Sequence, residues 1–157
     1  MDAIETLSNT DITSAIYDIN LDNQVVCFQC GNCCRNLKVR VSEFEARRIC
    51  EGLGLSWHYF LSNFLDPSYD NSASFFIRQR DNACIFLKPT SDKRRTICLI
   101  HAWKPLVCRE WEADYHRKQC QEGLQKYWGF TFTQEGKLQG NIRVMHEFKE
   151  YIKKYCR

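Results

Sequence analysis

Four cysteines within eight residues constrain this chain more than any other sequence feature. Cys27, Cys30, Cys33 and Cys34 spell the pattern C-x-x-C-x-x-C-C. Two residues between thiolates let the backbone curl around a metal with its amide groups directed at the sulfurs, and zinc knuckles and iron–sulfur loops both use this spacing. Gly31 lies inside the loop, where glycine adopts a positive φ at little cost. The motif therefore predicts a metal-binding loop.

The adjacent pair Cys33 and Cys34 indicates more than one position around the metal. Because the side chains of neighbouring residues diverge, we expect one of these thiols to join Cys27 and Cys30. The other thiol should then point to a second metal or to a different part of a cluster. A vicinal disulfide is the strained alternative.

A second set of cysteines follows later in the chain: Cys84, Cys98, Cys108 and Cys120. A hairpin predicted between the first two of these would bring Cys84 close to Cys98. Pro105 fixes the chain direction just before Cys108, and Arg109 would favour the thiolate of Cys108 because a nearby cation lowers a thiol pKa. A surface ion pair is the other role open to Arg109. The two sets together offer eight thiolates, enough for two four-coordinate metals or for one four-cysteine cluster plus a second site.

The cysteine content and the start of the chain bear on the cellular compartment. The chain has 157 residues, of which ten are cysteine, and an ordinary core could form at this length without disulfides. The first 23 residues contain five acidic residues and no Lys or Arg, unlike the basic start of a secretory signal. No apolar run is long enough for a transmembrane helix. We therefore expect a cytoplasmic protein with no membrane partner, in which clustered cysteines are metal ligands or redox groups rather than disulfides.

The charge distribution says less about partners. The net charge is +3, but residues 24–157 alone carry +8, from 22 basic and 14 acidic residues. The basic residues are spread along the chain and form no stripe of the kind that binds nucleic acid. We expect no nucleic-acid partner, and the sequence leaves open a protein substrate or a redox partner.

Hydrophobic periodicity predicts a small single domain of the α+β class, with short strands, a hairpin and several helices around a cysteine-ligated metal centre. Residues 1–23 form an acidic lead-in, partly helical or frayed, and residues 24–157 form the metal-binding domain. The expected helices run from Glu43 to Gly52 or Gly54, over 57–64, over 106–126 and over 142–155, and the expected strands over 37–41, 75–78, 84–87 and 96–100, with a turn at 88–92. Ser42 and Glu45 have the spacing of a capping box at the start of the first helix.

These motifs resemble the CxxCxxCC cysteine-cluster family, described as zinc- or iron-chelating domains, which includes YkgJ-like proteins and the flagellin lysine N-methylases. The resemblance covers about residues 25–125 and rests on these positions: Cys27-Phe28, Cys30-Gly31, Cys33-Cys34-Arg35, Cys84-Ile85-Phe86-Leu87, Cys98, Ile100, Lys104-Pro105, Cys108-Arg109, Cys120 and Gly123. It implies that the metal ligands are the eight cysteines of the two sets: Cys27, Cys30, Cys33, Cys34, Cys84, Cys98, Cys108 and Cys120.

The chain departs from the family at two positions. His101 stands where the family tends to have Tyr, and Lys104-Pro105 where it tends to have Arg-Pro. His101 is a candidate extra ligand or proton donor, with a packed or surface histidine as the alternative. The resemblance leaves Cys50 and Cys156 outside the ligand set, and we read Cys50 as a small buried apolar residue and Cys156 as a free thiol.

An all-thiolate site suits zinc or iron–sulfur and argues against magnesium and calcium. One compact C-x-x-C-x-x-C run supplemented by remote cysteines resembles the way an iron–sulfur cubane collects ligands, so we favour a [4Fe–4S] cluster over zinc. Three functions remain open: a metal module for stability, electron transfer or metal delivery; an S-adenosylmethionine-dependent protein lysine methyltransferase like the flagellin N-methylases; and a zinc-stabilised interaction domain. No motif fixes a catalytic base, and Gly52-Leu53-Gly54 fits a helix end better than a nucleotide-binding loop.

Overall fold

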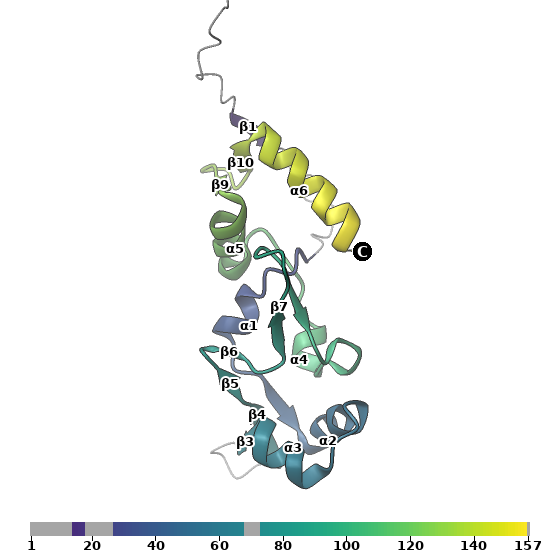
Figure 1. Ribbon diagram of the computed structural model, residues 1–157. Helices are drawn as coiled ribbons and strands as arrows, with labels where there is room; N and C mark the ends of the chain where they lie inside the picture. Colours follow the sequence, from purple (N-terminus) through teal and green to yellow (C-terminus); the bar gives the residue numbers. More distant parts are fainter. Residues whose placement is uncertain (1–13, 18–26, 68–72, 157) are drawn as a thin grey trace, which may run out of the picture.

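A computed structural model describes residues 14–17, 27–67 and 73–156. Within them the protein is an elongated α+β molecule, with α5 and α6 at one end and α2 and α3 at the other (Figure 1). The helices are α1 (Asn32–Asn36), α2 (Glu43–Gly52), α3 (Trp57–Phe64), the 3-10 turn η1 (His101–Trp103), α4 (Leu106–Arg109), α5 (Lys118–Trp128) and α6 (Ile142–Tyr155). The strands are β1 (Ser14–Tyr17), β2 (Arg40–Ser42), β3 (Leu65–Pro67), β4 (Ser74–Ile77), β5 (Gln79–Arg80), β6 (Ala83–Cys84), β7 (Leu87–Pro89), β8 (Thr96–Cys98), β9 (Thr131–Phe132) and β10 (Leu138–Asn141).

The first long helix begins and ends where the sequence predicts. The Ser42 hydroxyl accepts a hydrogen bond from the Glu45 amide at 3.2 Å, and the Glu45 carboxylate accepts one from the Ser42 amide at 2.9 Å, which completes a capping box at the start of α2. The helix ends at Gly52, and Gly54 has a φ of 67°, a left-handed conformation that glycine adopts without strain. The two glycines therefore terminate α2, as expected.

Two three-stranded sheets and two hairpins connect the helices. One sheet has the order β2-β4-β3 and the other β1-β10-β9, and all pairs are antiparallel. The part of the lead-in that is described, β1, is therefore a strand against β10, and the expected partial helix is wrong for these four residues. The rest of the lead-in lies outside the described residues.

The predicted single strand over 84–87 is wrong, because the chain changes its pairing partner there. Cys84 in β6 pairs with Gln79 in β5, whereas Leu87 in β7 pairs with Cys98 in β8. The two intervening residues form a turn. The predicted return strand over 96–100 is confirmed as β8, but its partner β7 includes Lys88 and Pro89, the first residues of the turn expected at 88–92, so the turn of the hairpin begins later than predicted.

The predicted helix over 106–126 is interrupted, which also corrects the sequence prediction. Helix α4 ends after one turn and α5 begins only at Lys118. Between them, the Asp114 side chain accepts a hydrogen bond from the His116 amide at 2.8 Å, and the Asp114 carbonyl accepts one from the Arg117 amide at 3.0 Å. An Asp that bonds to its own backbone offers an alternative to helical hydrogen bonds, so a turn replaces the middle of the expected helix.

Buried side chains form two hydrophobic cores. One core gathers residues of α5, α6, β10 and the loop before α1, among them Phe28, Leu124 and Phe148. The other gathers residues of β2, α2, α3 and β4, among them Ile49 and Phe60. Helix α1 lies between the two ends of the molecule in Figure 1. No helix in the described residues is long and apolar enough to cross a membrane.

Candidate metal centre

Four cysteines from three segments surround one small cavity. Cys27, Cys30, Cys33 and Cys120 line a cavity of about 20 Å³, together with Trp111. Cys27 and Cys30 belong to the loop before α1, Cys33 belongs to α1 and Cys120 to α5. We call these four cysteines the first thiol group. Its members include the first three cysteines of the motif and the last cysteine of the second set.

Close packing between α1 and α5 brings this group together. The Asn32 side-chain amide donates to the Gln119 carbonyl at 2.9 Å and to the Glu122 carboxylate at 3.2 Å. A Cβ added to Gly123 in α5 would lie 2.6 Å from the Cys30 sulfur. Glycine is therefore required here by a close approach of α5 to the cysteine loop. No local sequence signal indicates this role of Asn32, because its partners lie 87 and 90 residues away.

The surroundings of the first thiol group keep its sulfurs protonated in the absence of a metal. Burial raises the pKa of Cys30 to about 11, although a hydrogen bond from the Asn32 amide at 3.4 Å acts in the opposite direction. Burial also raises the pKa of Cys120, and desolvation by the surrounding protein raises that of Cys27 although the residue is exposed, again against a backbone hydrogen bond in each case. Low polarity disfavours thiolates unless a positive charge stabilises them, and a metal ion is such a charge.

A second thiol group consists of Cys84, Cys98 and Cys108. Burial raises the pKa of Cys108 to about 12, and the neighbouring Cys84 and Cys98 raise it further. Cys98 likewise raises the pKa of Cys84, so these two lie near each other, as the predicted hairpin requires. Pro105 is the N-cap of α4, and its carbonyl accepts hydrogen bonds from the amides of Cys108 and Arg109 at 3.0 Å, so it precedes the helix that carries Cys108.

The vicinal pair lies between the two groups. Cys33 raises the pKa of Cys27 and Cys30 on one side and of Cys98 and Cys108 on the other. The sulfurs of Cys33 and Cys34 are 3.9 Å apart. The prediction that their side chains diverge is therefore wrong. The hydrogen bond between the two thiols raises the pKa of Cys33, and burial adds to this.

Lys104 is the cation that acts on both groups. It lowers the pKa of Cys27 in the first group and of Cys98 and Cys108 in the second, in each case against the larger effect of burial. Arg109, from which we expected this effect on Cys108, acts on the pKa of Glu45. The sequence did mark Lys104 as a departure from the family pattern, but nothing in the local pattern tied it to the thiols.

A family model described as "Putative zinc- or iron-chelating domain", CxxCxxCC, matches residues 26–156. The chain belongs to the CxxCxxCC family. The match covers both thiol groups, and the family description supports metal binding by this chain. A search of curated proteins and a search of solved structures give no match to it.

The donor set of this CxxCxxCC chain fits zinc or iron, because thiolates are the ligands that these metals share in all-cysteine sites. All ten cysteines are free thiols. No three His, Cys, Asp or Glu side chains among the described residues stand in a geometry that could hold a metal ion. The structure thus brings the thiols into two neighbouring groups, and the assignment of individual ligands remains a prediction.

The other residues that the sequence singled out are His101, Cys50 and Cys156. His101 is exposed on η1, and Lys104, followed by burial, lowers its pKa. Cys50 is buried, as expected, and its thiol donates to the Leu55 carbonyl at 3.1 Å. Cys156 is a free thiol, as expected, and it is buried too.

Proposed function

We propose that this CxxCxxCC protein is a metal-binding module in which buried thiolates hold metal at two adjacent positions. The observation that carries the proposal is that Cys27, Cys30, Cys33 and Cys120, from three separate segments, line one cavity, while Cys84, Cys98 and Cys108 pack together against the other core. Burial makes each thiol a poor acid by itself, and only a bound cation compensates for the charge of several thiolates in one place. Metal binding would then contribute directly to the stability of the fold.

The ligands would come from both groups. Cys27, Cys30, Cys33 and Cys120 would hold metal at the first position. Cys84, Cys98 and Cys108 would hold metal at the second position, and the fourth thiol would be that of Cys34, whose sulfur is 3.9 Å from that of Cys33. The metal would supply positive charge, and Lys104 would add a second, fixed positive charge beside it.

We propose an iron–sulfur cluster at the first position, because a C-x-x-C-x-x-C run with one remote cysteine is the ligand pattern of such clusters. Zinc is the second candidate, and the size of the cavity favours it. A volume of about 20 Å³ is little more than the space that one water molecule requires, which suits a single ion. Either metal requires reduced thiols, so we place the protein in the reducing cytoplasm.

Anaerobic purification followed by an absorption spectrum and by analysis of iron, zinc and sulfide tests both proposals. We expect bound metal in either case, and iron with sulfide in the first. A colourless protein with stoichiometric zinc and without iron or sulfide would contradict the iron–sulfur proposal and support zinc. A chain that retains neither metal would contradict the function as a whole.

Single substitutions separate the two positions. Cys30→Ser should lose the metal of the first group and Cys108→Ser that of the second, with the other metal retained. Cys50→Ser is the matched control, because Cys50 is also buried but its thiol bonds to a backbone carbonyl. Equal metal content in all three variants would contradict the ligand assignment.

A further inference from the structure

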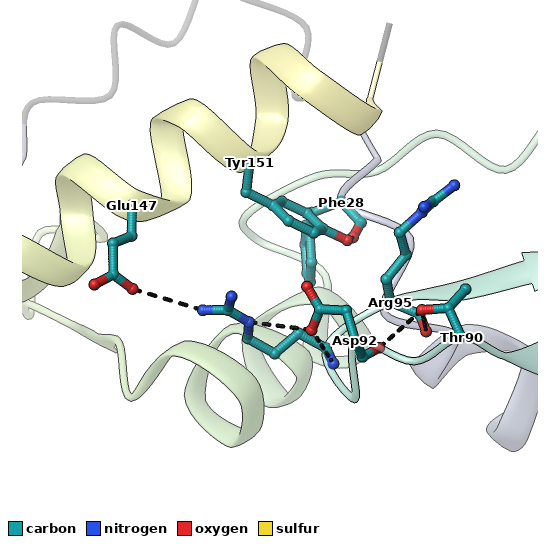
Figure 2. Close-up of polar contacts among 7 residues, drawn as sticks. Phe28, Thr90, Asp92, Arg95, Glu147 and Tyr151 are labelled. Atoms are coloured by element: carbon teal, nitrogen blue, oxygen red, sulfur yellow. Dashed lines mark hydrogen bonds and ion pairs between the residues drawn. The ribbon is translucent and has the colours of Figure 1, made fainter.

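The C-terminal end of α6 is joined to the loop before α1, which contains Cys27 and Cys30, by two hydrogen bonds. One is donated by α6 and the other by the loop. The Tyr151 hydroxyl donates to the Phe28 carbonyl at 2.8 Å, and the Gln29 side chain donates to the Tyr155 carbonyl at 2.9 Å. Figure 2 shows Tyr151 reaching from α6 to Phe28. These bonds join residues more than 120 positions apart. The last turn of α6 is therefore fixed next to the backbone between Cys27 and Cys30.

This arrangement brings a ninth thiol to the first thiol group. Cys156 directly follows α6 and is 4% exposed. It belongs to the same buried cluster as Cys30 and Cys120. Cys156 thus lies in the same core as two members of the first group, directly after a helix that is bonded to the backbone between Cys27 and Cys30.

The four members of the first group differ in exposure. Cys27 is exposed, whereas Cys30 and Cys120 are buried and Cys33 is intermediate. An exposed ligand exchanges with solvent more readily than a buried one. Arg95 stands close by, with its guanidinium 4.4 Å from the centre of the Tyr155 ring, and it only partly offsets the burial that raises the pKa of Cys156 to about 11. Such a thiol ionises when a bound metal ion supplies further positive charge.

We propose that Cys156 is a ninth metal-binding thiol, which shares with Cys27 the outer ligand position of the first thiol group. When the Cys27 sulfur leaves the metal, the Cys156 sulfur takes its place, so that the metal keeps its ligand number. This inference rests on the proposed function, since it presupposes metal at the first group. It gives α6 a chemical role in addition to its packing role.

The test uses the full chain, reduced and loaded anaerobically with Zn²⁺ alone, because thiolates bind zinc whichever metal is native. We expect Cys27→Ser to retain its zinc at the first group and to release it to a chelator about tenfold faster than the wild type, the range in which a disturbed metal site loses affinity. Cys27→Ser combined with Cys156→Ser should lose this zinc. Cys27→Ser combined with Cys50→Ser should retain it, since Cys50 and Cys156 are equally buried, at 4%.

Two results would overturn the inference: loss of the zinc from Cys27→Ser alone, as from Cys30→Ser, or equal retention by the two double variants. Circular dichroism checks that each variant is folded. Should the Cys27/Cys156 double variant fail to fold, release rates of the single variants decide. Cys156→Ser should then release zinc faster than Cys50→Ser, and equal rates would contradict the proposal. A wild-type chain that binds no zinc would instead contradict the proposed function, which keeps the two failures distinct.

Discussion

At the scale of single residues, cysteines that are buried alike differ in the groups that surround their thiols. Cys30 and Cys50 are both buried. Cys30 lies among other cysteines, which raise its pKa further, whereas the Cys50 thiol donates to a backbone carbonyl and the charged groups acting on its pKa are Glu51 and Arg47. Burial alone therefore does not identify a candidate ligand, and the neighbouring thiols do.

The raised thiol pKa of Cys30 predicts a loss of stability of the metal-free protein at alkaline pH. An unfolded chain releases this proton near the ordinary pKa of 9.0, whereas the folded chain holds it until about 11. Because the folded state binds the proton more strongly, the free energy of unfolding falls as the pH rises through this window, by about 2–3 kcal/mol. Urea unfolding of metal-free protein at pH 8 and pH 11 measures the change. The loss should be smaller in metal-free Cys30→Ser, and an equal loss would contradict the assignment.

Gly123→Ala is expected to displace the first thiol group although alanine favours helices. The new Cβ would meet the Cys30 sulfur at 2.6 Å and the Phe28 ring at 3.2 Å. Overpacking of this kind costs about 1–3 kcal/mol, more than the helix propensity of alanine returns. We expect lower metal content and a lower thermal midpoint. Gln125→Ala at an exposed position of α5 is the control and should change neither; unchanged metal content in Gly123→Ala would show that the approach of α5 is not needed.

At the scale of elements, Glu45 connects two helices that are far apart in sequence. One oxygen of its carboxylate accepts hydrogen bonds from the Ser42 amide and hydroxyl at 2.9 and 3.0 Å. The other oxygen accepts a hydrogen bond from the Leu106 amide at 2.8 Å. The same residue thus completes the cap of α2 and holds the start of α4, the helix that carries Cys108. Although burial acts in the opposite direction, these hydrogen bonds lower the pKa of Glu45.

Substitutions of Ser42 and of Glu45 should separate the cap of α2 from the hydrogen bond to α4. Ser42→Ala removes a helix cap and should cost about 1 kcal/mol of stability without change in metal content. Glu45→Ala removes both the cap and the bond to α4, so it should cost more and speed release of the metal held with Cys108. Unfolding midpoints and chelator release rates of the two variants test this. Identical behaviour of the variants would mean that the bond to α4 contributes nothing.

At the scale of the whole molecule, the two thiol groups belong to different cores. Cys30 and Cys120 lie in the core of α5 and α6, whereas Cys84, Cys98 and Cys108 pack against the core of α2 and α3. The cysteines of α1 stand at the junction. Metal at these groups would therefore fasten the two ends of the elongated molecule to each other, in addition to whatever each core contributes.

Docking of α6 onto the cysteine loop should depend on one buried hydrogen bond. Tyr151→Phe leaves the Phe28 carbonyl, which the Tyr151 hydroxyl reaches at 2.8 Å, without this donor. The loss should cost about 1–2 kcal/mol, seen as a lower midpoint of urea unfolding with an unchanged m-value. Tyr155→Phe keeps its ring under Arg95 and should stay close to the wild type. Equal midpoints for wild type and Tyr151→Phe would contradict a stabilising role for this bond.

Features that depend on near neighbours in the chain could be predicted before the fold was known. The C-x-x-C-x-x-C-C motif, the capping box at Ser42 and the β7–β8 hairpin are set by residues a few positions apart, where local geometry leaves few choices. The α+β class and the family followed from these. Where local preference competes with a turn, as at Asp114, the same reasoning predicted one helix instead of two.

Which distant groups meet depends on the packing of the folded protein. It divided the cysteines between two groups, gave Lys104 rather than Arg109 the position of the cation acting on Cys108, and buried Cys156 beside the first loop. These outcomes depend on how α5 and α6 pack, through contacts such as Asn32 with Gln119 and Tyr151 with Phe28. Contacts between residues about 90 to 120 positions apart leave no periodic signal in the sequence, because they arise from the shape of the packed core and not from the order of residues along one element.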